Sequence, residues 1–532
     1  MANIVREPCD EGIILARKAV APCTKSKGRW ILAATILASS MAFIDGTVVN
    51  VALPFLQKEL SATAIGVQWI VESYSLFLSA LLLVGGSLGD RYGRRLVFVI
   101  GVSLFALASA ACGLAANINQ LIAARAMQGI GAALLVPGSL AIISSSFGAD
   151  ARGKAIGTWS GFSAMTTAIG PVFGGWLIEH VSWRAVFFLN LPLAAAVLLI
   201  SFSHVPETRD KNERGPLDWL GAAFATIGLG GVVYGLIESS RNGFSHPAVL
   251  ISSVVGLVSL AVFVFNESRA QNPMLPLGLF HSRNFAGANV LTLLLYAALG
   301  GLFFFLTLDL VQVQGYTATA AGAALLPFVV IMFALSRWSG GLVDRFGPRL
   351  PLIVGPVIAT AGFVLFARPG FSANYWTSFF PAVVVLGLGM AVSVAPLTTT
   401  VMASVGQDKS GVASGINNAV SRTASLLAIA IFGVVMLHAF SRNLSYGLAR
   451  IDASEDVRRS IYEQRVKLAG IELPSNLDSR VRAQAEQAIA GSFVSGFRLI
   501  MFMSAALALG GALSSWLIIS PEKPDDRRMR TS

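Results

Sequence analysis

The chain has 532 residues, of which 55% are hydrophobic and only 13% are charged. Soluble globular proteins carry about 25% charged residues, so this composition excludes an ordinary cytosolic enzyme. The formal net charge of +11 would suggest nucleic-acid binding in a soluble protein, but in a membrane protein basic residues first indicate topology. The sequence therefore predicts a polytopic protein of the lipid bilayer that binds no nucleic acid.

Apolar runs long enough to cross a bilayer follow one another along the chain. A membrane-spanning helix needs about 20 apolar residues. We expect fourteen such helices, near residues 30–53, 67–88, 96–116, 120–147, 155–178, 185–204, 218–237, 247–266, 286–310, 320–342, 351–367, 376–402, 411–438 and 492–519. The predicted fold class is an all-α integral membrane bundle.

The Lys and Arg residues of the short connections orient these helices. With the N-terminus inside, the inner segments carry 23 Lys and Arg residues and the short outer loops only four. Basic loops stay in the cytoplasm. Both tails, 1–29 and 520–532, are therefore expected in the cytoplasm, and the protein in the cell (inner) membrane.

One predicted outer segment, 441–490, holds eight basic and seven acidic residues. Long loops escape the charge rule, so this segment does not contradict the orientation. Ser454 is typical of a helix N-cap, and Val457, Ile461 and Leu468 form one apolar stripe. We expect an extracellular helical hairpin with a helix through about Ala469. A solvated hairpin and a role in admitting or releasing substrate remain alternatives.

A ten-residue motif occurs twice, 254 residues apart. Residues 86–95 and 340–349 both follow G-x-L-x-D-R-aromatic-G-x-R, and both lie on the predicted inner side. Internal repeats of helical bundles are typical of secondary transporters. We expect six-helix bundles at 30–205 and 285–519, joined by a linker, 206–284, that carries helices 7 and 8.

The two repeated loops are candidate gates at the inner face. A carboxylate at a helix end can pair with a basic group, and glycines permit tight turns and close helix packing. The candidate gating residues are Gly86, Asp90, Arg91, Gly93 and Arg94 in the first copy and Gly340, Asp344, Arg345 and Gly347 in the second. The alternative is that these basic loops only hold the chain in its orientation by the positive-inside rule. The duplication of the motif favours the gate.

These loops resemble the signature of the major facilitator superfamily, and further motifs resemble its fourteen-span drug:proton antiporter branch, which is QacA/EmrB-like. They lie at residues 43–54, 68–74, 121–131 and 183–192. Gly170, Pro171, Gly174 and Gly175 resemble the antiporter motif of that branch, although Thr166 stands where the motif has Gly. The resemblance implies a major facilitator fold with two pseudo-repeats and a central two-helix insertion. Close packing of helices is the alternative role for the Gly-Pro segment.

Ionisable residues inside the apolar runs are the candidate proton-coupling and substrate-binding residues. Each costs about 2.5–3.5 kcal/mol on insertion scales, so each is a functional candidate. They are Asp45, Glu72, Arg125, Asp309 and Arg422. Their spacing from the predicted helix ends places the first three at similar depth in the outer half of the membrane. Arg422 is expected to face a cavity, and for Asp309 a loop position and a cavity position remain open.

The first bundle contains two carboxylates but only one arginine to pair with them. Arg125 is expected to pair with one acid and keep it ionised, which leaves the other to exchange protons. Asp45 is the preferred proton carrier and Glu72 the second choice. For Asp45, a hydrogen bond that merely fastens helices is the non-functional alternative.

The function expected from these residues is proton-coupled efflux of lipophilic, cationic toxic compounds by alternating access. A proton-coupled symporter or facilitator of a small polar solute is the alternative, and a membrane-embedded enzyme is the third class. No metal cluster, nucleophile–base pair or phosphate-binding loop occurs in the sequence, so we expect no enzyme activity, no metal and no cofactor beyond the proton gradient. The expected partners are lipid, protons and small-molecule substrates. A functional monomer is favoured, with a periplasmic adaptor left open.

Overall fold

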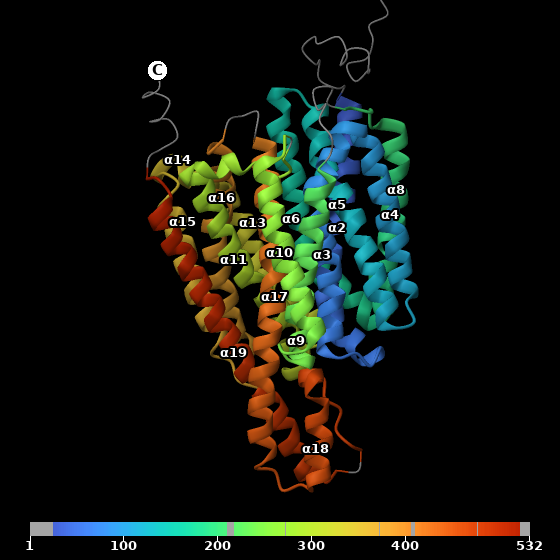
Figure 1. Cartoon of the computed structure of the whole chain (residues 1–532), viewed down its shortest axis with the longest axis vertical. Helices are drawn as coiled ribbons and strands as arrows, with labels where there is room; N and C mark the ends of the chain where they lie inside the picture. The colour runs from blue at the N-terminus through green and yellow to red at the C-terminus, as the bar shows by residue number, and fades with distance from the viewer. Residues whose placement is uncertain are drawn as a thin grey trace, which may run out of the picture.

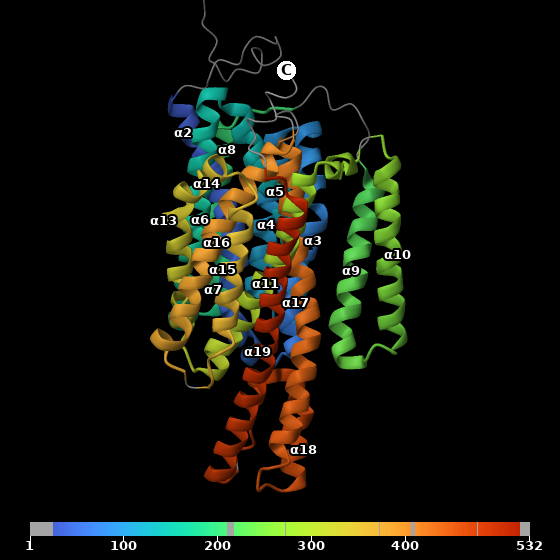
Figure 2. The ribbon, with the colours of Figure 1, turned by 90° about the vertical axis from the view of Figure 1, so that its left-hand side faces the viewer.

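The computed structural model describes residues 25–209, 218–271, 273–371, 373–405, 410–475 and 477–521. Helices dominate these ranges and stand side by side in one elongated bundle (Figures 1 and 2). The two predicted tails lie mostly outside the described residues, and so does part of the predicted linker.

The helices fall into three groups along the chain. The first half comprises α2 (Lys25–Glu59), α3 (Ala64–Tyr92), α4 (Arg94–Leu114), α5 (Ile118–Ser146), α6 (Ala149–His180), α7 (Trp183–Phe188) and α8 (Asn190–His204). The middle pair is α9 (Trp219–Asn242) and α10 (Pro247–Arg269). The second half comprises η1 (Leu277–His281), α11 (Arg283–Leu308), η2 (Asp309–Val313), α12 (Ala318–Ala323), α13 (Leu326–Gly340), α14 (Leu342–Phe346), α15 (Pro351–Phe366), η3 (Tyr375–Phe379), α16 (Phe380–Ala403), α17 (Ser410–Leu448), α18 (Glu455–Glu463), η5 (Gln464–Gly470) and α19 (Ser479–Ile518).

Twelve helical segments of the described chain are long and apolar enough to cross a membrane. This count does not support the fourteen spans expected from the sequence. The two expected spans missing from it correspond to α15 and α6. The helix α15 has only 16 residues, short of the length that a span needs. The helix α6 has 32 residues, but some of them lie outside the part of the chain to which this count applies.

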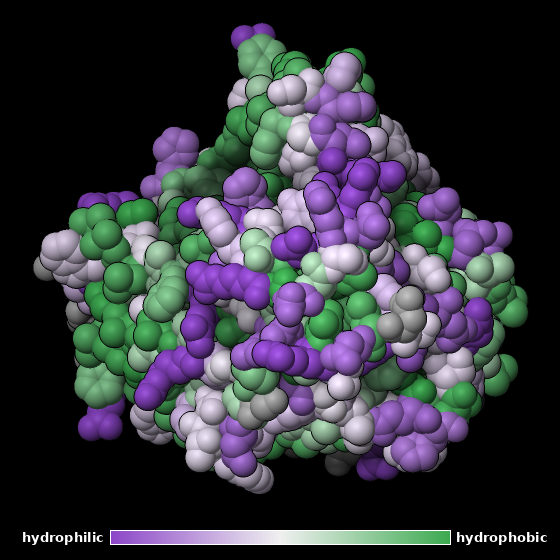
Figure 3. Space-filling view, turned by 90° about the horizontal axis from the view of Figure 1, so that it is seen from below, coloured by the Kyte–Doolittle hydropathy of each residue, from purple (hydrophilic) through white to green (hydrophobic). Residues whose placement is uncertain are grey.

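The two ends of the bundle differ. The start of α2 and the end of α19 lie at one end, here called the terminal end, and α18 lies beyond the other, the hairpin end (Figure 1). Seen from the hairpin end, hydrophilic side chains gather over the middle and hydrophobic ones lie mainly around the rim (Figure 3). This distribution suits a bundle whose sides contact lipid and whose end faces water.

The hairpin differs in two ways from the expectation. First, α17 continues to Leu448 and α19 begins at Ser479, so both ends of the predicted loop 441–490 belong to long helices that project beyond the bundle. Second, Ser454 caps α18 by accepting a hydrogen bond from Val457 N, but the helix ends at Glu463 rather than near Ala469. The chain continues from there as the 3-10 helix η5, Gln464–Gly470, which is kinked at Leu468, where φ is +54°.

One hydrophobic cluster joins the two halves. It includes Val48 and Leu56 of α2 and Phe305 of α11, and these side chains are almost fully buried. A smaller cluster, built around Phe98 and Phe105 of α4, lies within the first half. The halves are therefore in apolar contact with each other.

The middle pair lies at the side of the bundle (Figure 2). The helix α9 packs against α3 and α17, and α10 packs mainly against α9. Consequently α10 leaves a broad apolar surface exposed, which includes Ile251, Val254 and Val258. A helix with this much exposed apolar surface suits a lipid environment.

Candidate functional site

A buried ion pair joins α2 to α5 in the first half. Arg125 Nη1 lies 2.5 Å from Asp45 Oδ2, and both residues are 1% exposed. Gln128 donates to Asp45 Oδ1 at 2.9 Å and accepts from Arg125 Nη1 at 2.7 Å. Arg125 Nε also donates to the carbonyl of Ile70 on α3 at 3.2 Å. Such multiple bonds offset the cost of removing both charges from water.

The ion pair belongs to a longer polar chain that sequence reasoning missed. Gln128 Nε2 also lies 3.3 Å from Ser109 Oγ, and Asn190 donates to the same hydroxyl at 2.9 Å. The Tyr74 ring lies under the Arg125 guanidinium, and the distance from the ring centre to the guanidinium carbon is 4.3 Å. Gln128 and Asn190 stand inside the sequence motifs, but only the helix packing shows that they reach one network.

Glu72 lies outside this network. It is fully buried, and neither of its carboxylate oxygens has a hydrogen-bond partner. It precedes Tyr74 by two residues, so it points about 200° away around α3. It shares its helix face with Leu76, which packs against α9 and α17. The expectation that one acid pairs with Arg125 therefore agrees with the geometry for Asp45, but the three charged residues do not form one cluster.

Arg422 of α17 lies between the two halves. The helix α17 packs against α3 of the first half and α11 of the second, and Ser425, three residues after Arg422, donates to the Tyr296 carbonyl at 3.1 Å. The Arg422 side chain is half-buried. Among the described residues it has no ion pair and no hydrogen-bond partner. Its nitrogen atoms are also absent from the set of polar atoms that are both fully buried and unpartnered. Its guanidinium therefore contacts accessible space inside the bundle.

Asp309 is neither in a solvated loop nor beside the ion pair. It begins η2 near the hairpin end, is 2% exposed, and accepts a hydrogen bond from Gln314 at 3.2 Å. Gln314 also donates to the carbonyl of Gly370 and accepts from the backbone of Ala373. In this conformation Asp309 helps to fasten the connection between α15 and η3.

The first repeated loop is bonded within its own half. Arg94 Nε donates to Asp90 Oδ1 at 2.7 Å. Glu207, just after α8, accepts from the backbone of Arg95 and of Leu96, both at 3.0 Å. Gly93 turns the chain between α3 and α4 with a φ of +125°, a conformation that favours glycine. These bonds hold the loop to the chain that leaves α8.

The second repeated loop occupies the equivalent place in the second half. Gly347 has a φ of +75° and lies against Pro521, just after α19. Arg349 donates to the carbonyl of Trp516 near the end of α19. Asp344 and Arg345 are exposed, and Gly86 and Gly340 leave room around them. In both copies the arginine after the aspartate stacks on the next aromatic ring, Arg91 on Tyr92 and Arg345 on Phe346.

The Gly-Pro segment of α6 packs closely on both of its sides. Gly170 and Gly174 face Thr47 and Val48 of α2. On the other side, a methyl group at Gly175 would lie 2.5 Å from the carbonyl oxygen of Ala318 in α12. Glu179 accepts hydrogen bonds from the backbone and the hydroxyl of Thr319, at 2.8 and 2.7 Å. The segment therefore joins the two halves near the hairpin end.

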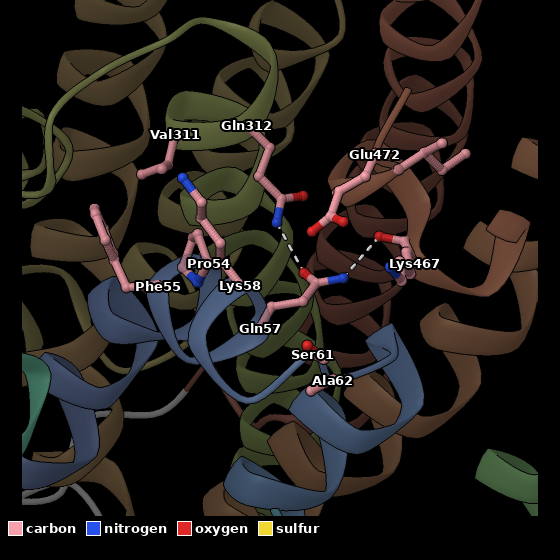
Figure 4. A pocket seen from close by; sticks show the side chains of 12 residues that line it. Pro54, Phe55, Gln57, Lys58, Ser61, Ala62, Val311, Gln312, Lys467 and Glu472 are labelled. Atoms are coloured by element: carbon pink, nitrogen blue, oxygen red, sulfur yellow. Dashed lines mark hydrogen bonds between the residues drawn. The ribbon is translucent and has the colours of Figure 1, made fainter. Parts of the chain in front are cut away.

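A second seam between the halves lies at the same end. Gln57 of α2 accepts from Gln312 of η2 at 2.8 Å and donates to the carbonyl of Lys467 in η5 at 2.8 Å (Figure 4). These side chains border a cavity of about 250 Å³, which Phe55 and Ile471 also line. Deeper in the bundle, Gln68 of α3 donates to the carbonyl of Ile429 in α17 at 2.9 Å. The first and second halves are thus bonded to each other at the hairpin end.

No group of three or more His, Cys, Asp or Glu residues that could hold a metal occurs within the described ranges. The polar chemistry of the bundle interior is instead that of the Asp45–Arg125 pair, the lone acid Glu72 and the accessible cation Arg422.

The sequence matches the Major Facilitator Superfamily profile over residues 35–429. It is 33% identical over 500 residues to the multidrug resistance protein Stp of Mycobacterium tuberculosis, which covers 91% of each chain. It is 31% identical to the tetracenomycin C resistance and export protein of Streptomyces glaucescens, over 95% of this chain and 94% of that protein.

Solved structures agree on the fold. A bacterial homologue of the human lysosomal transporter Spinster superposes with a TM-score of 0.66 at 17% identity, covering 94% of this chain and 99% of that one. The helical bundle, the duplicated loop and the match to the family profile lead to one conclusion. This multi-pass membrane chain belongs to the Major Facilitator Superfamily, and it is a transporter of small molecules rather than an enzyme.

Proposed function

We propose that the protein exports lipophilic compounds in exchange for protons, as a member of the fourteen-span branch of the family. Several relatives are named as drug resistance or export proteins, which supports efflux. In the proposed topology α6 and α15 cross the membrane besides the twelve apolar segments. At 1.5 Å per residue, 16 residues rise about 24 Å, so α15 needs only a few flanking residues to span the bilayer core.

The proposed topology places the terminal end in the cytoplasm and the hairpin outside. The excess of Lys and Arg in the short loops of the terminal end supports this orientation. The two halves are bonded at the hairpin end through Gln57–Gln312 and Glu179–Thr319, whereas the first repeated loop is bonded within its own half. This conformation corresponds to a transporter closed to the outside. Alternating access then breaks the hairpin-end contacts and closes the terminal end.

The observation that carries proton coupling is the isolation of Glu72. An ionised carboxylate there would have neither a hydrogen bond nor a counter-ion, and inside a membrane protein such a charge costs several kcal/mol. Glu72 is therefore assigned the proton in this conformation. Its helix face packs between α9 and α17, so a movement of α17 against α3 changes its surroundings and permits release of the proton.

Asp45 takes the other role in this scheme. Its negative charge is paired with Arg125, and Gln128 donates a hydrogen bond to it. Protonation of Asp45 would therefore leave a buried guanidinium without its counter-ion. We therefore reverse the order of preference that the sequence suggested and assign proton exchange to Glu72. In this scheme a single chain is the transporting unit. The cationic character that the sequence suggested for the substrates is not carried into the scheme.

The test uses purified protein in proteoliposomes with a pH-sensitive dye inside. Ethidium and a panel of antibiotics are the transported probes. The enclosed dye reports whether protons move with each probe, as acidification or alkalinisation of the lumen. Glu72→Gln is expected to bind the transported probe but to move no protons with it, whereas Glu463→Gln, at an exposed acid of the hairpin, serves as the control. Normal proton movement by Glu72→Gln would overturn the assignment of proton exchange to this residue. Movement of the probe and of protons in the same direction would favour a symporter.

A further inference from the structure

The helix α17 carries a polar stripe through an otherwise apolar span. Its members are Ser414, Asn418, Ser421, Arg422 and Ser425, which recur at helical spacing on one face. Asn418 is exposed and the others are half-buried. The span as a whole is strongly hydrophobic. A polar, accessible stripe inside such a span lines a path for water or substrate.

Arg422 is the charged member of this stripe. It lies twelve residues into α17, about 18 Å from the first residue of the helix. This depth is beyond the reach of a side chain that extends to the membrane surface. Its helix packs against α3 of the first half, and Ser425, three residues further on, donates to the Tyr296 carbonyl of α11, so Arg422 lies where the halves meet. An arginine held there without a partner is costly unless a ligand or water completes its hydrogen bonds.

The other charges near the centre do not neutralise Arg422. Asp45 is already paired with Arg125, and these two charges cancel. Asp309 lies at the hairpin end and is bonded to Gln314. Glu72 faces α9 and α17 from the opposite side of α3 to Tyr74. Among the described residues Arg422 is therefore left as a positive charge without a counter-ion.

We infer that Arg422 is a specificity-determining residue and that the substrates are acidic amphiphiles, with a carboxylate or sulfonate on an aromatic or apolar body. A guanidinium binds such oxyanions with two parallel hydrogen bonds. The apolar helices α3 and α11, which pack against α17, supply surface for the apolar body of such a ligand. A cationic compound of the same shape is repelled. This inference rests on the proposed export function and names the substrate class of the same site.

The experiment compares two ligands that share one ring system and differ in charge. Binding of 2-naphthoate and of 2-naphthylmethylammonium to the full-length protein in nanodiscs is measured by calorimetry without any gradient. The wild type is expected to bind the naphthoate about tenfold more tightly, the effect of one charge-assisted hydrogen bond. Arg422→Gln is expected to remove this preference, and Arg422→Lys to restore part of it.

The control is Arg442→Gln, on the projecting part of the same helix, where the side chain is exposed. It is expected to keep the preference for the naphthoate. Equal or reversed preference in the wild type, or an unchanged preference in Arg422→Gln, would overturn the inference. Ammonium binding and the unfolding temperature of Arg422→Gln show whether that variant is folded. Because no proton gradient is applied, this result is independent of the Glu72 test of coupling.

Discussion

Arg125 and Asp45 form an ion pair with a 2.5 Å contact, although they are 80 residues apart and lie on different helices. The pair is sealed from solvent, and Gln128 bonds to both partners. The energetic consequence is asymmetric, because removing one partner strands a buried charge whereas removing both does not.

Arg125→Leu is expected to lower the free energy of unfolding by about 3–5 kcal/mol, because Asp45 loses its counter-ion. The double variant Asp45→Asn/Arg125→Leu is expected to recover much of this loss. Both are checked by thermal unfolding in detergent with a thiol-independent dye. If the double variant is as unstable as the sum of the single variants, the pair does not act as one unit.

The close approach of α6 and α12 makes a prediction about conformation. Gly175→Val places a side chain against the Ala318 carbonyl and is expected to separate the halves at the hairpin end. The expected result is a longer distance between spin labels on the two halves at that end. The matched control is Gly157→Val on the same helix, where nothing lies within 4 Å. A change of equal size in the control would contradict the role of the contact.

The two turn glycines of the repeated loops give a prediction about stability. Gly93→Ala and Gly347→Ala force a side chain into a positive φ, which costs about 1–2 kcal/mol each. Gly93→Ala also brings a methyl group within 2.6 Å of the Glu207 carboxylate, so its effect is expected to be the larger. Unfolding temperatures test this ranking. Gly340→Ala has open space and no positive φ, and it should leave the unfolding temperature nearly unchanged.

The amide of Gln57 makes a prediction about local dynamics. Gln57→Leu removes the bonds to Gln312 and Lys467 and leaves the segment Gln464–Gly470 less fastened. Hydrogen–deuterium exchange in this segment is expected to rise several-fold, whereas Lys58→Leu, an exposed neighbour, serves as the control. Equal exchange in both variants would show that other contacts hold the segment.

The sequence predicted much of the fold because bilayer thickness imposes a length on every apolar run. It could not settle the number of spans, since α15 is shorter than that length. The change from α18 to the 3-10 helix η5 after Glu463 was missed, because η5 makes contacts with a distant helix, such as the Lys467–Gln57 bond.

For the site, the sequence identified the charged residues but not their pairing. Spacing along a helix gives depth, and depth placed Glu72 near Asp45 and Arg125. Their separation depends on the rotation of α3, which directs Tyr74 toward Arg125 and Glu72 toward α9 and α17. The sequence also predicted that Arg422 faces a cavity, but its lack of a partner depends on how the helices of the two halves pack.

The bonds of Gln57 tie the projecting hairpin to the joint between the halves. Because one amide holds α2, η2 and η5 together, these three segments can separate at this point only in concert. In the proposed orientation the hairpin is open to reagents that never enter the cell. An antibody fragment that clamps η5 against α2 would then arrest the transport cycle from the outside, without competing for the place where the cargo binds.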